Sequence, residues 1–292
     1  MFKDNWVKFG FGDRLSQSPS RTKPFIIDYS AARSHPTLTN PIDIAHEDCW
    51  TIYETMPKPI TLMVSGGVDS QAMAYAFETS GVPDVRYVWA RYNDGLNDHD
   101  FETSSFYTDH GIDVEVMDFD VIGFHENELL EWATTYRNNS PHILTHCRIA
   151  SLLEGTVVSS GTVVTRQGTG QMNYSVFGLE RYSRLSGQPI IGFFLSYSAE
   201  LCHSMLDFKT SSSPYEHKCD VYRRGGFPVL PQTEKMHGFE RLKQKYDEVI
   251  VSPKIRMKYR KQPSQRSYDL LFRYPLVDAI PYSQSQNFIL PD

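Results

Sequence analysis

Apolar and polar residues alternate along the middle of this chain in two patterns, one typical of strands and the other typical of helices. Short apolar or alternating runs, which predict buried strands, occupy 60–66, 85–92, 112–119, 156–161 and 189–196. Segments with apolar residues at helical spacing predict helices from Asp69 to Gly81 and over 97–111, 125–137, 141–155 and 198–208. Alternation of this kind predicts an α/β fold, with a mostly parallel, Rossmann-like sheet that helices cover on both faces.

The two ends of the chain lack this rhythm. The first part is rich in Pro, Ser, Thr and charged residues, with one short strand predicted over 24–29. The last part has many Pro and Tyr residues and one predicted helix over 237–250. We therefore expect an N-terminal extension (1–57), a central α/β domain (58–206) and a C-terminal appendage (207–292) that folds over the functional edge of the sheet.

Composition narrows the class of protein. Of the 292 residues, 22% are charged and 40% are hydrophobic, as in soluble globular proteins. The formal net charge of −6 argues against a surface that coats nucleic acid broadly, although a local basic patch is compatible with it. No apolar run approaches the ~20 residues of a membrane helix, and the N-terminal stretch lacks the apolar core of a signal peptide. These features predict a cytoplasmic protein without a membrane partner.

The four cysteines, Cys49, Cys147, Cys202 and Cys219, form no Cys-x-x-Cys pair, which disfavours a thioredoxin-like centre. Reduced thiols in a reducing compartment are the simplest interpretation. Cys202 and Cys219 each lie close in sequence to a histidine, His203 and His217, so these four side chains could hold zinc. Structural cysteines are the alternative.

The stretch Ser-Gly-Gly-Val-Asp-Ser, residues 65–70, joins the first predicted strand of the central domain to its helix. Backbone N–H groups in such a turn point into one concavity, and the helix dipole adds partial positive charge. Glycine lets the backbone approach phosphate oxygens without an intervening Cβ, and Ser65 and Ser70 can donate hydroxyls. Asp69 could cap the helix or hold Mg²⁺. The alternative is a glycine-rich turn without a ligand.

These six residues resemble the Ser-Gly-Gly-x-Asp-Ser signature of the PP-loop ATP pyrophosphatase superfamily, and the resemblance covers roughly 58–200. It implies a HUP-like α/β fold related to the adenine-nucleotide α-hydrolases, with ATP and Mg²⁺ bound at this loop. Most members of that family cleave ATP between its α- and β-phosphates and attach AMP to a carbonyl-type oxygen. A nitrogen or sulfur nucleophile then displaces AMP.

The resemblance also implies site residues. The positions implied in nucleotide binding are Val64, Ser65, Gly66, Gly67, Val68, Asp69, Ser70, Trp89, Arg91 and Gly161. Catalytic roles are expected for Ser65 and Asp69, with Asp69 also the metal ligand, and for the cations Arg148 and Lys218. For Trp89 and Arg91, a core tryptophan beside a surface arginine is an equally good interpretation. A basic cluster at 254–261 could contact pyrophosphate or nucleic acid, or form a solvated face.

The nearest subclass is asparagine synthetase-like or NAD synthetase-like, because no thiol machinery is evident. Residue 2 is Phe2 rather than the catalytic cysteine of glutamine-dependent members, so ammonia would come from solution or from a separate donor. The acceptor would be a small molecule or a nucleobase, and a homodimer is left open. The alternatives are a phosphoadenosine phosphosulfate reductase-like enzyme, a tRNA-modifying or nucleobase-modifying enzyme, a non-catalytic nucleotide-binding protein, and a structural protein that has lost its ligand.

Overall fold

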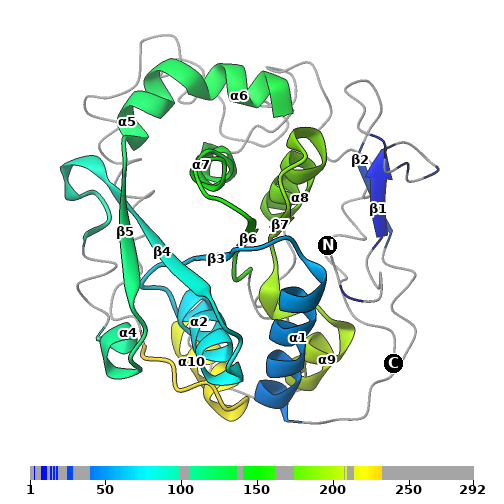
Figure 1. The fold of residues 1–292 in the computed structure, drawn as a ribbon, viewed down its shortest axis with the longest axis vertical. Coiled ribbons are helices and arrows are strands. Elements are labelled where there is room, and N and C mark those ends of the chain that lie inside the picture. Colours follow the sequence, from blue (N-terminus) through cyan, green and yellow to red (C-terminus); the bar gives the residue numbers. More distant parts are fainter. Residues whose placement is uncertain are drawn as a thin grey trace.

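A single parallel sheet of five strands forms the centre of the computed structural model (Figure 1). The structure describes residues 3, 8–11, 14, 16, 18, 25–28, 40–98, 105–136, 141–161, 174–206, 208 and 214–231. In spatial order the strands are β5 (Val114–Phe119), β4 (Val85–Tyr92), β3 (Ile60–Met63), β6 (Thr156–Val158) and β7 (Ile190–Ile191). Strands β4 and β5 therefore lie on one side of β3, and the later strands β6 and β7 lie on the other.

Helices cover both faces of this sheet, which confirms the Rossmann-like α/β prediction (Figure 1). On one face lie α1 (Pro41–Thr55), α2 (Val68–Ser80), α4 (Phe106–Asp109), α9 (Ala199–Leu206) and α10 (Pro214–Arg224). On the other lie α5 (Val121–Gly123), the π-helical η3 (Phe124–Glu128), α6 (Leu129–Tyr136), α7 (Pro141–Ala150) and α8 (Tyr174–Ser186).

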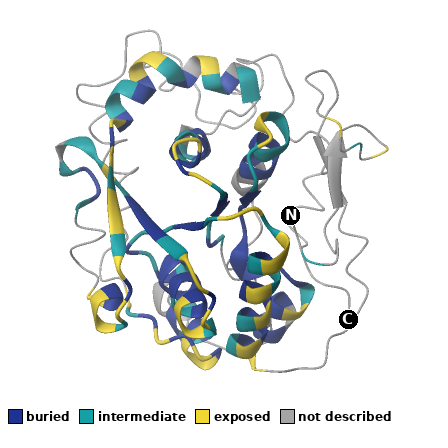
Figure 2. Ribbon diagram, in the orientation of Figure 1, coloured by how far each residue is buried: buried dark blue, intermediate teal, exposed yellow. Residues whose placement is uncertain are grey.

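Alternation along the strands divides the core in two. Ile60, Leu62 and Val64 belong to the cluster under α1 and α2, whereas Met63 packs with the cluster under α6, α7 and α8. Successive side chains of a strand point to opposite faces, so this division follows directly from the period of two. Figure 2 shows the inner strands and the facing sides of the helices as buried, while much of the edge strand β5 is exposed.

Two predicted elements differ from the described structure: one is described only in part, and one was wrong in extent. Of the helix expected over 97–111, the described residues show Asp98 as helical and then α4, with a turn at Ser105 before it, while 99–104 lie outside the described residues. The Asn97 side chain caps the end of β4: it accepts from the Tyr92 amide at 2.7 Å and donates to the Ala90 carbonyl at 2.8 Å. The strand expected over 189–196 pairs only as β7, after which the chain turns into the 3₁₀-helix η4 (Phe194–Ser196). The helix expected over 237–250 lies outside the described residues.

The region expected to be an N-terminal extension contains a helix, α1, that the sequence reasoning missed. Pro41 stands in its first turn with Asp43, and Ile44, Cys49 and Ile52 are buried on one side of it. A proline and an acidic residue in the first turn are ordinary start signals. This helix contacts α2 and α9, so it shares the core of the sheet's first face. The strand expected over 24–29 is β2 (Phe25–Asp28), which pairs antiparallel with β1 (Lys8–Phe11).

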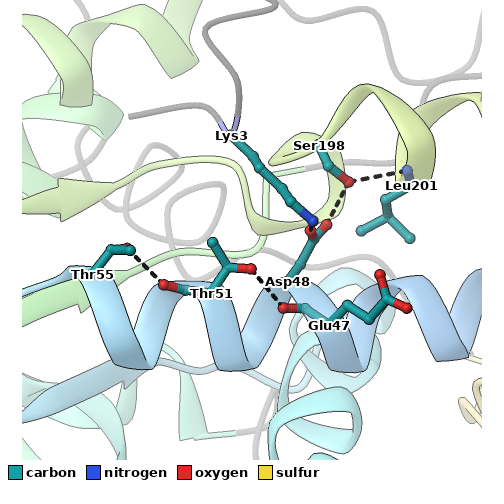
Figure 3. Close-up of polar contacts among 7 residues, drawn as sticks. All are labelled: Lys3, Glu47, Asp48, Thr51, Thr55, Ser198 and Leu201. Carbon is teal, nitrogen blue, oxygen red and sulfur yellow. Dashed lines mark hydrogen bonds and ion pairs between the residues drawn. The ribbon is translucent and has the colours of Figure 1, made fainter.

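A buried charged network joins α1 to the start of α9 (Figure 3). The Asp48 carboxylate accepts from Lys3 Nζ at 3.1 Å and from Ser198 Oγ at 2.5 Å, and Ser198 Oγ in turn accepts from the Leu201 amide at 3.1 Å. Burial raises the pKa of Asp48 to about 6, and the Ser198 hydrogen bond and the Lys3 charge oppose that rise. A buried carboxylate is tolerated here because both of its oxygens have donors.

Candidate functional site

The Ser-Gly-Gly-Val-Asp-Ser loop lies at the carboxyl end of β3, where the strand order of the sheet reverses between β3 and β6. Ligands of open α/β sheets bind outside the carboxyl ends of the strands at such a switch point. Gly67 is the N-cap of α2, with φ −72° and ψ 144°, and neither Gly66 nor Gly67 has a positive φ. What glycine offers at these positions is therefore the missing Cβ and not an unusual dihedral angle.

The backbone amides of this loop are available for a ligand. The first α2 amide with a backbone acceptor is that of Gln71, which donates to the Gly67 carbonyl at 3.0 Å. Within the described part of the chain, the amides of Gly66, Val68, Asp69 and Ser70 donate no hydrogen bond, and the Gly67 amide meets only Ser65 Oγ, at 3.3 Å. Unsatisfied N–H groups at the positive end of a helix dipole form an anion-binding site.

Two hydroxyls stand beside these amides. Ser65 Oγ and Ser70 Oγ lie 3.1 Å apart, so one donates to the other in the free loop. Both can rotate to donate to an anion, because a hydroxyl hydrogen turns to suit its acceptor. The structure thus brings together the loop residues that the sequence singled out. That they bind a nucleotide stays a prediction.

Asp69 faces α10 rather than the amides of its own helix. Its Oδ2 accepts from Lys218 Nζ at 2.6 Å, and its Oδ1 accepts from the Tyr222 hydroxyl. The structure therefore places Asp69 and Lys218, which the sequence treated as separate catalytic residues, in direct contact. It also adds Tyr222, which sequence reasoning missed.

This arrangement offers a metal ion no ready-made site. Both oxygens of Asp69 are engaged, and the described residues contain no group of three or more His, Cys, Asp or Glu side chains placed around one point. The Mg²⁺ predicted at Asp69 would compete with Lys218 and Tyr222 for that carboxylate. We therefore assign no catalytic step to it.

Two buried polar side chains donate hydrogen bonds to carbonyl groups of the loop. Tyr107 donates to the Ser65 carbonyl at 2.5 Å, and burial raises the pKa of Tyr107, which keeps its hydroxyl protonated. Gln71 donates to the Gly66 carbonyl at 2.9 Å and accepts from the Leu230 amide at 2.8 Å. A polar residue directly after the motif, on the buried side of a helix, was a signal that could have identified Gln71. Nothing in the sequence pointed to Tyr107.

The residues predicted to bind the nucleotide at the ends of β3 and β4 differ in how far their side chains are exposed. The side chains of Val64 and Trp89 are buried in the core. Arg91 lies at the exposed end of β4 and pairs with Asp118 at 2.7 Å. Trp89 and Arg91 are thus a core tryptophan and a surface arginine in this structure, the alternative that the sequence had left open.

Gly161 occupies the end of β6, facing the end of β7. Its φ is +66°, and a Cβ built there would lie 2.9 Å from the Phe193 Cα. The Phe194 and Leu195 amides donate to the Ser159 and Ser160 carbonyls at 3.0 and 2.9 Å, which holds the two strand ends together. Only glycine suits both the left-handed backbone and this close approach. The loop that follows, 162–173, lies outside the described residues.

The structure does not bring Arg148 to the loop. Arg148 pairs with Glu128 at 3.0 Å and lies over the Trp132 ring, on the opposite helical layer. It is near the end of α7, which leads into the amino end of β6, and the amino ends of parallel strands lie at the far edge of the sheet from the loop. The basic cluster at 254–261 lies outside the described residues.

All four cysteines are buried and none is in a disulfide. Burial raises the pKa of each thiol, to about 12 for Cys202. A thiol held protonated is neither a good nucleophile nor a good metal ligand. The side chains of His203 and His217 lie outside the described residues, so the zinc site stays untested as a set of four.

Comparison with known proteins gives loose likenesses of fold. No family model matches the sequence, and no curated protein matches it. Among solved structures, an NMN synthetase from Francisella tularensis is similar at 11% identity and a TM-score of 0.39, over 83% of this chain and 98% of that one. The U34-tRNA thiolase NcsA from Methanococcus maripaludis, with its 4Fe–4S cluster, is similar at 10% identity and a TM-score of 0.36, over 85% and 88%.

An NH3-dependent NAD synthetase from Campylobacter jejuni is similar at 12% identity and a TM-score of 0.34, over 78% of this chain and 93% of that one. Likenesses this loose do not assign a reaction. Within the described residues, no helix is long and apolar enough to span a membrane.

Proposed function

We propose that this chain is a PP-loop ATP pyrophosphatase, which transfers AMP from ATP to a carbonyl-type oxygen of its substrate and releases pyrophosphate. A nitrogen nucleophile, supplied as ammonia from solution or by a separate donor, then displaces AMP. The observation that supports this most directly is that the amides at 66–70 have no backbone acceptor among the residues that the structure describes, at the switch point of the sheet. The acceptor would be a small molecule or a nucleobase.

The chemistry asks the protein mainly for positioning and for neutralisation of charge. The substrate oxygen attacks the α-phosphorus, the bond between that phosphorus and the bridging oxygen of the β-phosphate breaks, and pyrophosphate leaves. The loop amides and the hydroxyls of Ser65 and Ser70 would hold the departing pyrophosphate. Donors already aimed at the developing charge lower the barrier because they need no reorganisation.

Lys218 is a cation that contacts the loop directly. Its ammonium group lies 2.6 Å from the Asp69 carboxylate, and its side chain is 20% exposed. After pyrophosphate has left, the nitrogen attacks the carbonyl carbon, and the C–O bond to AMP breaks.

The burial of all four thiols supports nitrogen rather than sulfur chemistry. A reductase of the sulfonucleotide type and a thiolating enzyme both need a reactive thiolate or a metal cluster on thiolates. Here the thiols of Cys49, Cys147 and Cys202 are almost fully covered, and they lie on three different helices. We therefore expect ATP turnover to survive native-state alkylation with N-ethylmaleimide.

The test is an incubation of the full chain with ATP labelled on the α-phosphate, ammonium and fractionated metabolite pools. We expect labelled AMP and pyrophosphate in the presence of the right acceptor. Ser65→Ala should lower the rate by about 100-fold, the usual cost of removing one donor from an anion hole. The matched control is Ser183→Ala, which also removes one serine hydrogen bond, to the Gln188 carbonyl on the other face. Failure of the wild type to bind ATP, or full activity of Ser65→Ala, would contradict the proposal.

A further inference from the structure

The direction of each loop amide is tied to that of the preceding carbonyl. In a trans peptide the C=O and N–H bonds point in opposite directions. A hydrogen bond that holds the Ser65 carbonyl therefore also aims the Gly66 amide, and one that holds the Gly66 carbonyl aims the Gly67 amide. Both of these carbonyls are held by buried side chains.

We propose that Tyr107 and Gln71 are positioning residues, which turn the Ser65–Gly66 and Gly66–Gly67 peptides so that their N–H groups face a bound pyrophosphate. This inference rests on the proposed function and adds two residues to it. Neither side chain needs to touch the ligand. Each acts by keeping a carbonyl oxygen, which would repel a phosphate, on the protein side of the loop.

Tyr107 controls the first peptide. It comes from α4, between β4 and β5, and its side chain is 2% exposed. Its hydroxyl reaches the Ser65 carbonyl at 2.5 Å, a short contact for an O–H donor and a neutral acceptor. The Gly66 amide at the other end of this peptide has no acceptor among the described residues.

Gln71 controls the second peptide and connects it to a distant segment. Its amide nitrogen holds the Gly66 carbonyl at 2.9 Å, and its amide oxygen is fixed by the Leu230 amide at 2.8 Å, beyond the end of α10. Because Leu230 fixes which end of the side chain is the acceptor, the donor end must face Gly66. The Gly67 amide is then directed to the opposite side, where Ser65 Oγ meets it at 3.3 Å, a long contact that an anion oxygen can replace.

Side-chain hydrogen bonds are needed to fix the orientation of these peptides because the loop contains two adjacent glycines. Glycine has no Cβ to disfavour the flipped conformation, so a Gly-Gly peptide left to itself samples both orientations. A loop that presents its amides only part of the time binds an anion more weakly, in proportion to the competent fraction. Two buried hydrogen bonds remove that loss before the ligand arrives.

The experiment uses the full chain labelled with ¹⁵N-glycine and titrated with inorganic pyrophosphate, with calorimetry alongside. In the wild type we expect the Gly66 and Gly67 amide resonances to shift on binding. Tyr107→Phe should abolish the Gly66 response and Gln71→Met the Gly67 response, each with about a tenfold weaker affinity. Tyr182→Phe is the matched control, since it also removes one hydroxyl bond, to Gln188 at 3.0 Å on the other face. It should bind pyrophosphate as the wild type does.

If Gln71→Met does not fold, Gln71→Glu keeps the size and the acceptor for Leu230 but replaces the donor by a carboxylate, so its readout is the Gly67 amide shift and not the affinity, which the added charge also lowers. A loss of both glycine responses in each variant, with lowered thermal stability, would indicate a general structural role and overturn the inference. Unchanged affinity and unchanged amide shifts would also overturn it, while leaving the proposed function intact. If the wild type itself binds neither pyrophosphate nor ATP, the proposed function fails first.

Discussion

The contact between Asp69 and Lys218 joins the loop to a helix about 150 residues away in sequence, and its strength can be measured by a double-mutant cycle. The variants are Asp69→Asn, Lys218→Met and the pair together. Asparagine keeps the shape of the aspartate, and methionine keeps most of the lysine stem. The cycle therefore isolates the charged contact from loss of packing.

The expected size follows from the geometry. The two charged atoms lie 2.6 Å apart, and the side chains of Lys218 and Asp69 are 20% and 24% exposed. At an effective dielectric constant of about 20, charges about 3 Å apart attract by roughly 5 kcal/mol. Desolvation and the ordering of the lysine side chain oppose most of that, so exposed pairs yield about 0.2–1 kcal/mol and hydrogen bonds to charged groups about 1.5–3 kcal/mol. We expect a coupling of about 1–2 kcal/mol.

Urea unfolding of the four proteins at one pH and about 0.1 M salt gives this coupling. The comparison is the pair of Arg86 and Glu115, 2.8 Å apart but 38% and 54% exposed, where we expect less than about 0.5 kcal/mol. Equal coupling at the two pairs, or none between Asp69 and Lys218, would refute the view that α10 is tied to the loop through this contact.

Three further predictions concern the backbone and the buried titratable groups. Gly161→Ala should destabilise the protein by about 1–3 kcal/mol more than Gly187→Ala. Both glycines have a positive φ, but only at Gly161 would a Cβ collide with backbone. Equal losses of stability in urea unfolding would show that the backbone beyond β6 can relax. Burial lowers the pKa of His125 to about 3 from an ordinary 6.5, so the free energy of unfolding should fall below pH 6.5 by up to about 1.4 kcal/mol per pH unit, and His125→Gln should flatten that slope. The pH dependence that Asp48 adds has the opposite sign. Because its pKa is raised from 3.8 to about 6, its contribution to the free energy of unfolding is fully present below pH 3.8 and is lost as the pH rises through 6. The free energies of unfolding of the wild type and of Asp48→Asn should therefore differ by an amount that changes by up to about 3 kcal/mol between pH 4 and pH 7. A difference that stays constant with pH would contradict the assigned pKa.

The sheet and the loop could be read from the sequence because they rest on local rules. Strand alternation, helix stop glycines and the Gly-Gly turn are each encoded within a few adjacent residues, so a mostly parallel sheet and the position of 65–70 at the end of β3 could be predicted. The helix expected over 97–111 is described only at Asp98 and as α4, so its full extent stays a prediction. The hydrogen bonds of the Asn97 side chain to the end of β4 are a feature that periodicity does not register.

The partners of the loop depended on tertiary structure. Lys218, Tyr222 and Leu230 reach it from α10 and the segment that follows, about 150 residues away in sequence but beside α2, and Tyr107 reaches it from the next crossover. Hydrogen bonds between residues so far apart leave no periodic trace in the chain, since only the folded path of the backbone sets their distances. The sequence by itself thus determined that this joint can present amides to an anion. Only the fold decided which side chains aim those amides, because aiming requires groups held rigidly on neighbouring elements.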